Sequence, residues 1–82
     1  GAMESSQRVA CQVGGALRRL RLERDLGQKQ VAGRAGISRS MLSRYEHGHR
    51  YPSLPILAKI LRALDCSAED FGRRLGPWGC LP

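Results

Sequence analysis

The sequence has few of the residues that build a disulfide framework, a metal site or a membrane span. Its three cysteines, Cys11, Cys66 and Cys80, are odd in number and widely spaced, so we expect reduced thiols rather than a paired framework. No Cys-x-x-Cys occurs, and His47 and His49 have no cysteine near them in the chain, so no metal site is predicted. No apolar run approaches the ~18 residues of a membrane helix and no charged-then-apolar leader opens the chain, so we expect neither a span nor classical secretion.

Aromatic residues are also scarce, and the sequence contains no recognisable catalytic constellation. Aromatics make up 5% of the chain, too few for the stacking platform on which proteins usually hold single-stranded RNA. A chain of 82 residues forms one small domain with little room for a substrate pocket. The sequence therefore predicts neither an enzyme nor a cofactor.

Arginine, in contrast, is abundant. The chain has 14 Lys+Arg, twelve of them Arg, against 7 Asp+Glu, and its net charge is +7. The excess is concentrated in residues 28–50, where five basic residues are opposed only by Glu46, whereas residues 51–82 carry four basic and three acidic residues. This charge points to a polyanionic partner, and the forked arginine side chain suits phosphate and guanine.

The spacing of apolar residues predicts an all-α fold of five short helices. We expect them over about residues 13–25, 28–35, 38–47, 54–64 and 67–75. Ser38, Ser53 and Ser67 are candidate N-caps, and Gly36 and Gly48 follow the second and third helices where a left-handed residue is needed.

The two ends of the chain are predicted to lie outside the domain of residues 13–75. The opening Gly-Ala-Met resembles a tag remnant, and the polar residues 4–12 show no sustained period, so we expect residues 1–12 to form a flexible N-terminal arm or a frayed helix start. Residues 76–82 have two prolines and two glycines and are expected to be a flexible C-terminal tail. Trp78 in this tail is either a packed anchor or an idle residue.

The third predicted helix has an apolar face and a polar face. On a helical wheel, Met41, Leu42 and Tyr45 share one arc with Ser38. The opposite arc holds Arg39, Ser40, Ser43, Arg44 and His47. A polar face of this kind fits the DNA major groove, where arginine can bond guanine with two hydrogen bonds. The alternative is an ordinary solvated helix face, and the wheel alone does not decide between the two.

The stretch from Gln28 to Ser67 resembles the Cro/CI-type helix-turn-helix family of phage repressors and bacterial regulators, also called the XRE family. The resemblance covers about residues 13–75. It depends on Gln28 with Val31-Ala32, the turn Ala35-Gly36-Ile37-Ser38, Ser43–Glu46 with Gly48, and Pro52-Ser53-Leu54. It implies a compact, five-helix, lambda-repressor-like domain whose second and third helices form the helix-turn-helix.

The resemblance also implies roles for individual residues. The positions that face bases are Arg39, Ser40, Ser43 and Arg44. Gln28, His49 and Arg50 match positions that contact phosphate, and we also expect Lys29 and Ser38 to do so. Arg21 and Glu46 match a pair that forms a buried salt bridge between the first and third helices in several family members. Gly27 departs from the family pattern, because it replaces the usual side-chain N-cap of the second helix.

The sequence therefore predicts a cytoplasmic, nucleoid-associated protein that binds double-stranded DNA as a transcriptional regulator. We expect a repressor that acts as a homodimer on a palindromic operator. The alternative is a protein-interaction module, such as an antitoxin or adaptor, whose partner covers the fourth helix or the C-terminal tail. Apolar residues of the fourth helix spread over a wide arc, which fits either a subunit interface or a helix buried on most sides.

Overall fold

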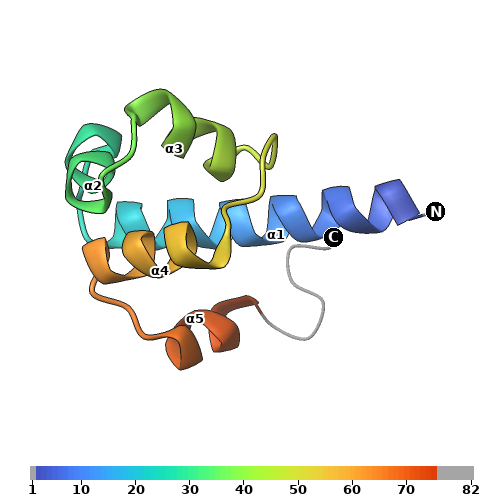
Figure 1. The fold of residues 1–82 in the computed structure, drawn as a ribbon. Coiled ribbons are helices and arrows are strands. Elements are labelled where there is room, and N and C mark those ends of the chain that lie inside the picture. Colours follow the sequence, from blue (N-terminus) through green and yellow to red (C-terminus); the bar gives the residue numbers. More distant parts are fainter. Residues whose placement is uncertain (1, 76–82) are drawn as a thin grey trace.

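Residues 2–75, which a computed structural model describes, form five helices and no strand (Figure 1). The helices are α1 (Ala2–Glu23), α2 (Gln28–Ala35), α3 (Arg39–Glu46), α4 (Leu54–Ala63) and α5 (Ala68–Leu75). The all-α, five-helix prediction is confirmed. None of these helices is both long enough and apolar enough to cross a bilayer.

The long helix α1 runs through the molecule and packs mainly against α3 and α5. In Figure 1, α2 and α3 lie above α1, α4 runs along the lower edge of α1 in front of it, and α5 lies below both. The main packing partners are α2 with α4, α1 with α3, and α2 with α3, so the helix-turn-helix pair is supported by both α1 and α4.

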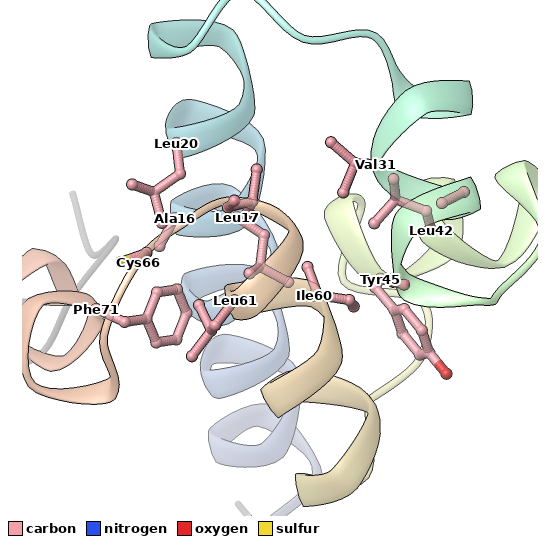
Figure 2. Close-up of a cluster of buried hydrophobic side chains, with 13 residues drawn as sticks. Ala16, Leu17, Leu20, Val31, Leu42, Tyr45, Ile60, Leu61, Cys66 and Phe71 are labelled. Carbon is pink, nitrogen blue, oxygen red and sulfur yellow. The ribbon is translucent and has the colours of Figure 1, made fainter.

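All five helices contribute side chains to one hydrophobic core. Its largest fully buried members are Leu17 and Leu20 from α1, Val31 from α2, Leu42 from α3, Ile60 from α4 and Leu64 just after it. In Figure 2, side chains of α1 and α4 lie in the middle, with Val31, Leu42 and Tyr45 on one side and Phe71 of α5 on the other. The burial of these side chains is the main source of the domain's stability.

The helix starts lie where capping chemistry predicts them. The Ser38 hydroxyl accepts a hydrogen bond from the Met41 N–H at 3.1 Å, and Ser53 and Ser67 accept in the same way from Ile56 and Asp70. These bonds satisfy N–H groups that have no partner within their own helix.

Four helix ends within residues 2–75 share one hydrogen-bond pattern. After each of α1 to α4, a left-handed residue one or two positions past the helix turns the chain, with φ of 56° at Asp25, 72° at Gly36, 74° at Gly48 and 54° at Asp65. The next amide N–H donates five residues back in every case, for example from Ile37 to the carbonyl of Ala32 at 3.0 Å. This is the Schellman motif, which gives otherwise unpaired carbonyls a partner.

Residues 4–12 were expected to be a flexible arm or a frayed helix start, and the structure includes them in α1, so they are helical rather than a separate arm. The apolar residues of this segment show only a weak helical period. Contacts with a loop distant in the sequence stabilise the helix there instead. Ala10 is only 3% exposed, and the Gln7 side chain donates to the carbonyl of Gly48 at 3.0 Å. The Tyr51 hydroxyl also donates to the carbonyl of Ser6. The predicted C-terminal tail, with Trp78 and Cys80, lies outside the described residues.

Candidate nucleic-acid interface

Helix α3 separates into a buried face and an exposed face. Leu42, Tyr45 and Glu46 are 1%, 7% and 5% exposed and point into the domain. The predicted base-reading residues lie on the other side, where Arg39, Ser40 and Arg44 are exposed and Ser43 is half-buried. Two long, forked arginines thus flank two short serines, which leave room for the helix to approach a groove closely.

Helix α2 and the turn after it hold α3 against the core. Val31, Ala32 and Ala35 are buried, and their small size lets α2 pack close to its neighbours. Between α2 and the start of α3 lies an open depression whose lining includes Gln28, Lys29, Gly33 and Arg39. The N-termini of both helices carry partial positive charge, and the lysine and arginine add full charges, so this surface favours an anion.

A buried ion pair connects α3 to α1. The Arg21 Nε donates to Glu46 Oε2 at 2.7 Å, and its Nη2 donates to Oε1 at 3.0 Å. A third Arg21 nitrogen donates to the carbonyl of Leu26 at 2.9 Å, in the α1–α2 corner. The two-pronged geometry fixes both the distance and the rotation of Glu46 relative to α1.

Gln28 joins this pair and connects it to α2. Its Nε2 donates to Glu46 Oε1 at 3.0 Å, so Glu46, the last residue of α3, is bonded to the side chains of two other helices. The Gln28 side chain therefore supports α3 directly. Gly27, which has no side chain to cap α2, instead donates its N–H to Gln30 Oε1 at 2.9 Å.

The loop after α3 extends the exposed basic surface. His49 and Arg50 are both exposed and lie next to the C-terminal end of α3. The His47 and His49 rings stack with their centroids 5.9 Å apart, and His47 Nδ1 lies 2.8 Å from the carbonyl oxygen of Ser43. Among the predicted phosphate-contacting residues, Ser38 is therefore the N-cap of α3, and His49 and Arg50 follow its C-terminal end. Gln28 and Lys29 open α2 and line the depression beside Arg39.

Gly14 is a residue of this site that the sequence reasoning missed. It is buried where α1 crosses the end of α3, and a Cβ added there would stand 2.1 Å from the Tyr45 carbonyl oxygen and 2.8 Å from that of Glu46. No side chain fits in that space. A glycine inside an amphipathic helix is the available signal, because such a residue commonly marks a close backbone approach.

The groups with shifted pKa values lie away from this surface, where α5 packs. Burial raises the pKa of the Cys66 thiol, and its hydrogen bond to Asp70 at 3.6 Å raises it further. Desolvation raises the pKa of Asp70, but the Cys66 hydrogen bond and the charges of Arg74 and Arg73 outweigh it, so the pKa lies below its usual value. Within residues 2–75, no cluster of three or more His, Cys, Asp or Glu side chains is arranged to hold a metal ion.

Comparison with known proteins gives one consistent family. A helix-turn-helix family model matches residues 17–71, more than half of the chain. An HTH-type transcriptional regulator of Mycobacterium tuberculosis is 38% identical over 63 residues, which are 77% of this chain and 45% of that protein. The HTH-type regulator y4dJ of Sinorhizobium fredii is 40% identical over 55 residues, which are 67% of this chain and 71% of that protein. The chain thus spans less than half the length of the first of these relatives.

Solved structures agree with the sequence comparison. The restriction-modification controller protein C.AhdI from Aeromonas hydrophila matches with a TM-score of 0.73 and 32% identity, over 76% of this chain and 94% of that one. The clp gene regulator ClgR from C. glutamicum matches with a TM-score of 0.75 and 28% identity, over 78% of this chain and 83% of that one.

Fold and site together define a helix-turn-helix domain of the DNA-binding class. Helices α2 and α3 meet at the Gly36 turn, and α3 presents its polar face to solvent. The chain belongs to the Cro/CI-type helix-turn-helix family of transcriptional regulators.

Proposed function

We propose that this chain reads a two-fold operator in double-stranded DNA and represses transcription by blocking access of the polymerase. The observation that carries the proposal is the exposed face of α3, where Arg39, Ser40, Ser43 and Arg44 lie opposite the buried Leu42 and Tyr45. A helix of this width fits the major groove, and its arginines can each bond guanine with two hydrogen bonds. The protein would act in the cytoplasm, associated with the nucleoid.

Phosphate contacts on both sides of α3 would orient it in the groove. The residues proposed for these contacts are Gln28, Lys29, Ser38, His49 and Arg50. Such contacts position the protein without reading sequence, whereas contacts from α3 to base edges supply specificity. The net charge of +7 supports the non-specific part of this binding.

A homodimer is part of the proposal, because one α3 contacts too few base pairs for useful specificity. Two copies related by a two-fold axis would place their α3 helices in successive major grooves, one helical turn apart. Helix α4 supplies an apolar surface for such pairing, since Leu54 at its start is 81% exposed. The same surface could instead take an unrelated protein, which is the second candidate function.

Selection from a randomised duplex pool, followed by sequencing, tests the proposal. Enrichment of a palindrome with half-sites about one helical turn apart would support a dimeric operator reader. Arg39→Ala is expected to weaken binding to the enriched operator by about 1–3 kcal/mol and to relax the preference at one base pair. Equal losses on operator and random DNA would contradict the base-reading role of Arg39.

Arg50→Ala provides the matched comparison, because its proposed contact is to phosphate. Its loss should weaken operator and random DNA alike and reduce the slope of log affinity against log salt by about 0.9. A pool that enriches no sequence, together with binding that disappears uniformly with salt, would overturn sequence-specific reading. The partner search would then turn to α4.

A further inference from the structure

One stripe along α1 follows the C-terminal end of α3 and the loop beyond it. Gln7, Cys11 and Gly14 are spaced by four and three residues, so they lie on a single face of the helix. Gly14 lies against the carbonyls at the end of α3, and a Cβ added to Gly48 would stand 3.0 Å from the Cys11 Sγ. Arg21, seven residues after Gly14, continues the same face and holds Glu46.

The first turns of α1 hold both ends of the segment from Gly48 to Tyr51. At one end, Gln7 Nε2 donates to the Gly48 carbonyl at 3.0 Å. At the other end, the Tyr51 hydroxyl donates to the carbonyl of Ser6. These side-chain bonds join residues 41 and 45 positions apart in the chain, so neither is a consequence of local helix geometry.

His49 and Arg50 are the two residues between these tethers, and both are exposed. An untethered loop would have to be ordered when its side chains contact phosphate, and that ordering would oppose binding. A loop that α1 already holds in place avoids most of the conformational entropy cost of ordering on binding. The Gln7 and Tyr51 side chains bond the backbone carbonyls of Gly48 and Ser6, so their effect on binding would pass through the loop.

We propose that Gln7 and Tyr51 are positioning residues, which hold His49 and Arg50 in place to contact the DNA backbone. This inference rests on the proposed function, because it assigns those two residues to phosphate. It gives the N-terminal part of α1 a role in affinity for every DNA sequence and none in the choice among sequences.

The variants Gln7→Ala and Tyr51→Phe, alone and combined, test the proposal in the full chain. Tyr51→Phe removes one hydroxyl and keeps the ring, so it leaves the fold least disturbed. Gln12→Ala is the matched control, because Gln12 Nε2 also bonds a distant carbonyl, that of Leu75 at 3.1 Å, but on the side of α5. Urea unfolding of each variant establishes that it is folded.

Fluorescence anisotropy with a labelled duplex of random sequence and with the enriched operator measures the effect. The combined variant should bind both duplexes about three- to tenfold more weakly than the wild type, with the base preference unchanged. Gln12→Ala should bind as the wild type does. In a background that already carries His49→Ala and Arg50→Ala, the same two substitutions should have no further effect.

Three other results would overturn the inference. Wild-type affinity in the combined variant, while Arg50→Ala binds weakly, would show that the tethers do not position the loop. A loss that persists in the His49→Ala/Arg50→Ala background would show that Gln7 and Tyr51 act elsewhere. A wild-type chain that binds no duplex at all would overturn the proposed function, and this inference with it.

Discussion

Glu46 is the residue on which the orientation of α3 depends most directly. Its carboxylate is buried, and it accepts hydrogen bonds from Arg21 on α1 and Gln28 on α2. An acid at a helix C-terminus opposes the helix dipole, so its presence needs another reason. The bonds to two neighbouring helices supply that reason.

Glu46→Ala is expected to lower the free energy of unfolding by about 3–5 kcal/mol, because it leaves the Arg21 charge buried without a partner. The double variant Arg21→Met/Glu46→Leu should lose less than Glu46→Ala alone, since it removes both charges and keeps apolar volume. Urea unfolding of the three proteins checks both statements. A loss below about 1 kcal/mol for Glu46→Ala would match an exposed pair and contradict a structural role.

At the scale of the element, the helix ends show which features are local. Ser38, Ser53 and Gly36 could be predicted as caps because their roles depend only on residues close in the sequence. Each serine accepts a hydrogen bond from an N–H three residues later, and Gly36 turns the chain at the end of α2. Asp25 and Asp65 take the same left-handed position as Gly36 but were not predicted to do so. Aspartate tolerates that region poorly compared with glycine, so its sequence signal is weak.

Asp25→Gly is expected to raise the free energy of unfolding by up to about 1 kcal/mol, because glycine adopts the left-handed region without strain. The change also removes an acid from a helix C-terminus. Gly36→Ala is the converse control, since φ is 72° and an added Cβ there has nothing within 4 Å to clash with. The Gly36→Ala protein should lose about 1 kcal/mol of unfolding free energy from backbone strain alone. Thermal unfolding measures the change in both variants. A destabilised Asp25→Gly protein would show that the aspartate side chain stabilises the corner.

The start of α1 shows where prediction from the sequence stops. The polar residues 4–12 lack a clear helical period, and the contacts that hold them helical are with Gly48 and Tyr51, about forty residues away. Gly14 is visible in the sequence, but only the fold shows that it faces the end of α3. The polar face of α3 could be predicted because it depends on spacing within one helix. The assignments to bases and phosphates remain predictions.

At the scale of the whole molecule, α4 serves two surfaces. Ile60, Leu61 and, just beyond the helix, Leu64 are buried in the core, which accounts for one part of its wide apolar arc. Leu54 and Ala58 account for another part and are exposed. The later turns of α4 therefore pack inside the domain, while its first two turns leave apolar side chains uncovered. A subunit interface on this surface stays a prediction.

Leu54→Lys tests whether that surface pairs two copies of the chain. A lysine at position 54 would place a charge in an otherwise apolar interface, so we expect dimerisation to weaken at least about tenfold. Binding to a palindromic operator should weaken with it, whereas the unfolding free energy should stay near the wild-type value because Leu54 is 81% exposed. Sedimentation velocity over a range of concentrations measures the association.

Leu22→Lys is the control for an added surface charge, because Leu22 on α1 is also exposed, at 51%. It should leave dimerisation unchanged. A Leu54→Lys protein that sediments as the wild-type dimer would exclude the first turn of α4 from the interface. A wild-type chain that stays monomeric at every concentration, alone and on operator DNA, would contradict the dimer itself. Each chain would then bind its half-site independently, and the affinity for DNA with two half-sites would be no greater than for DNA with one.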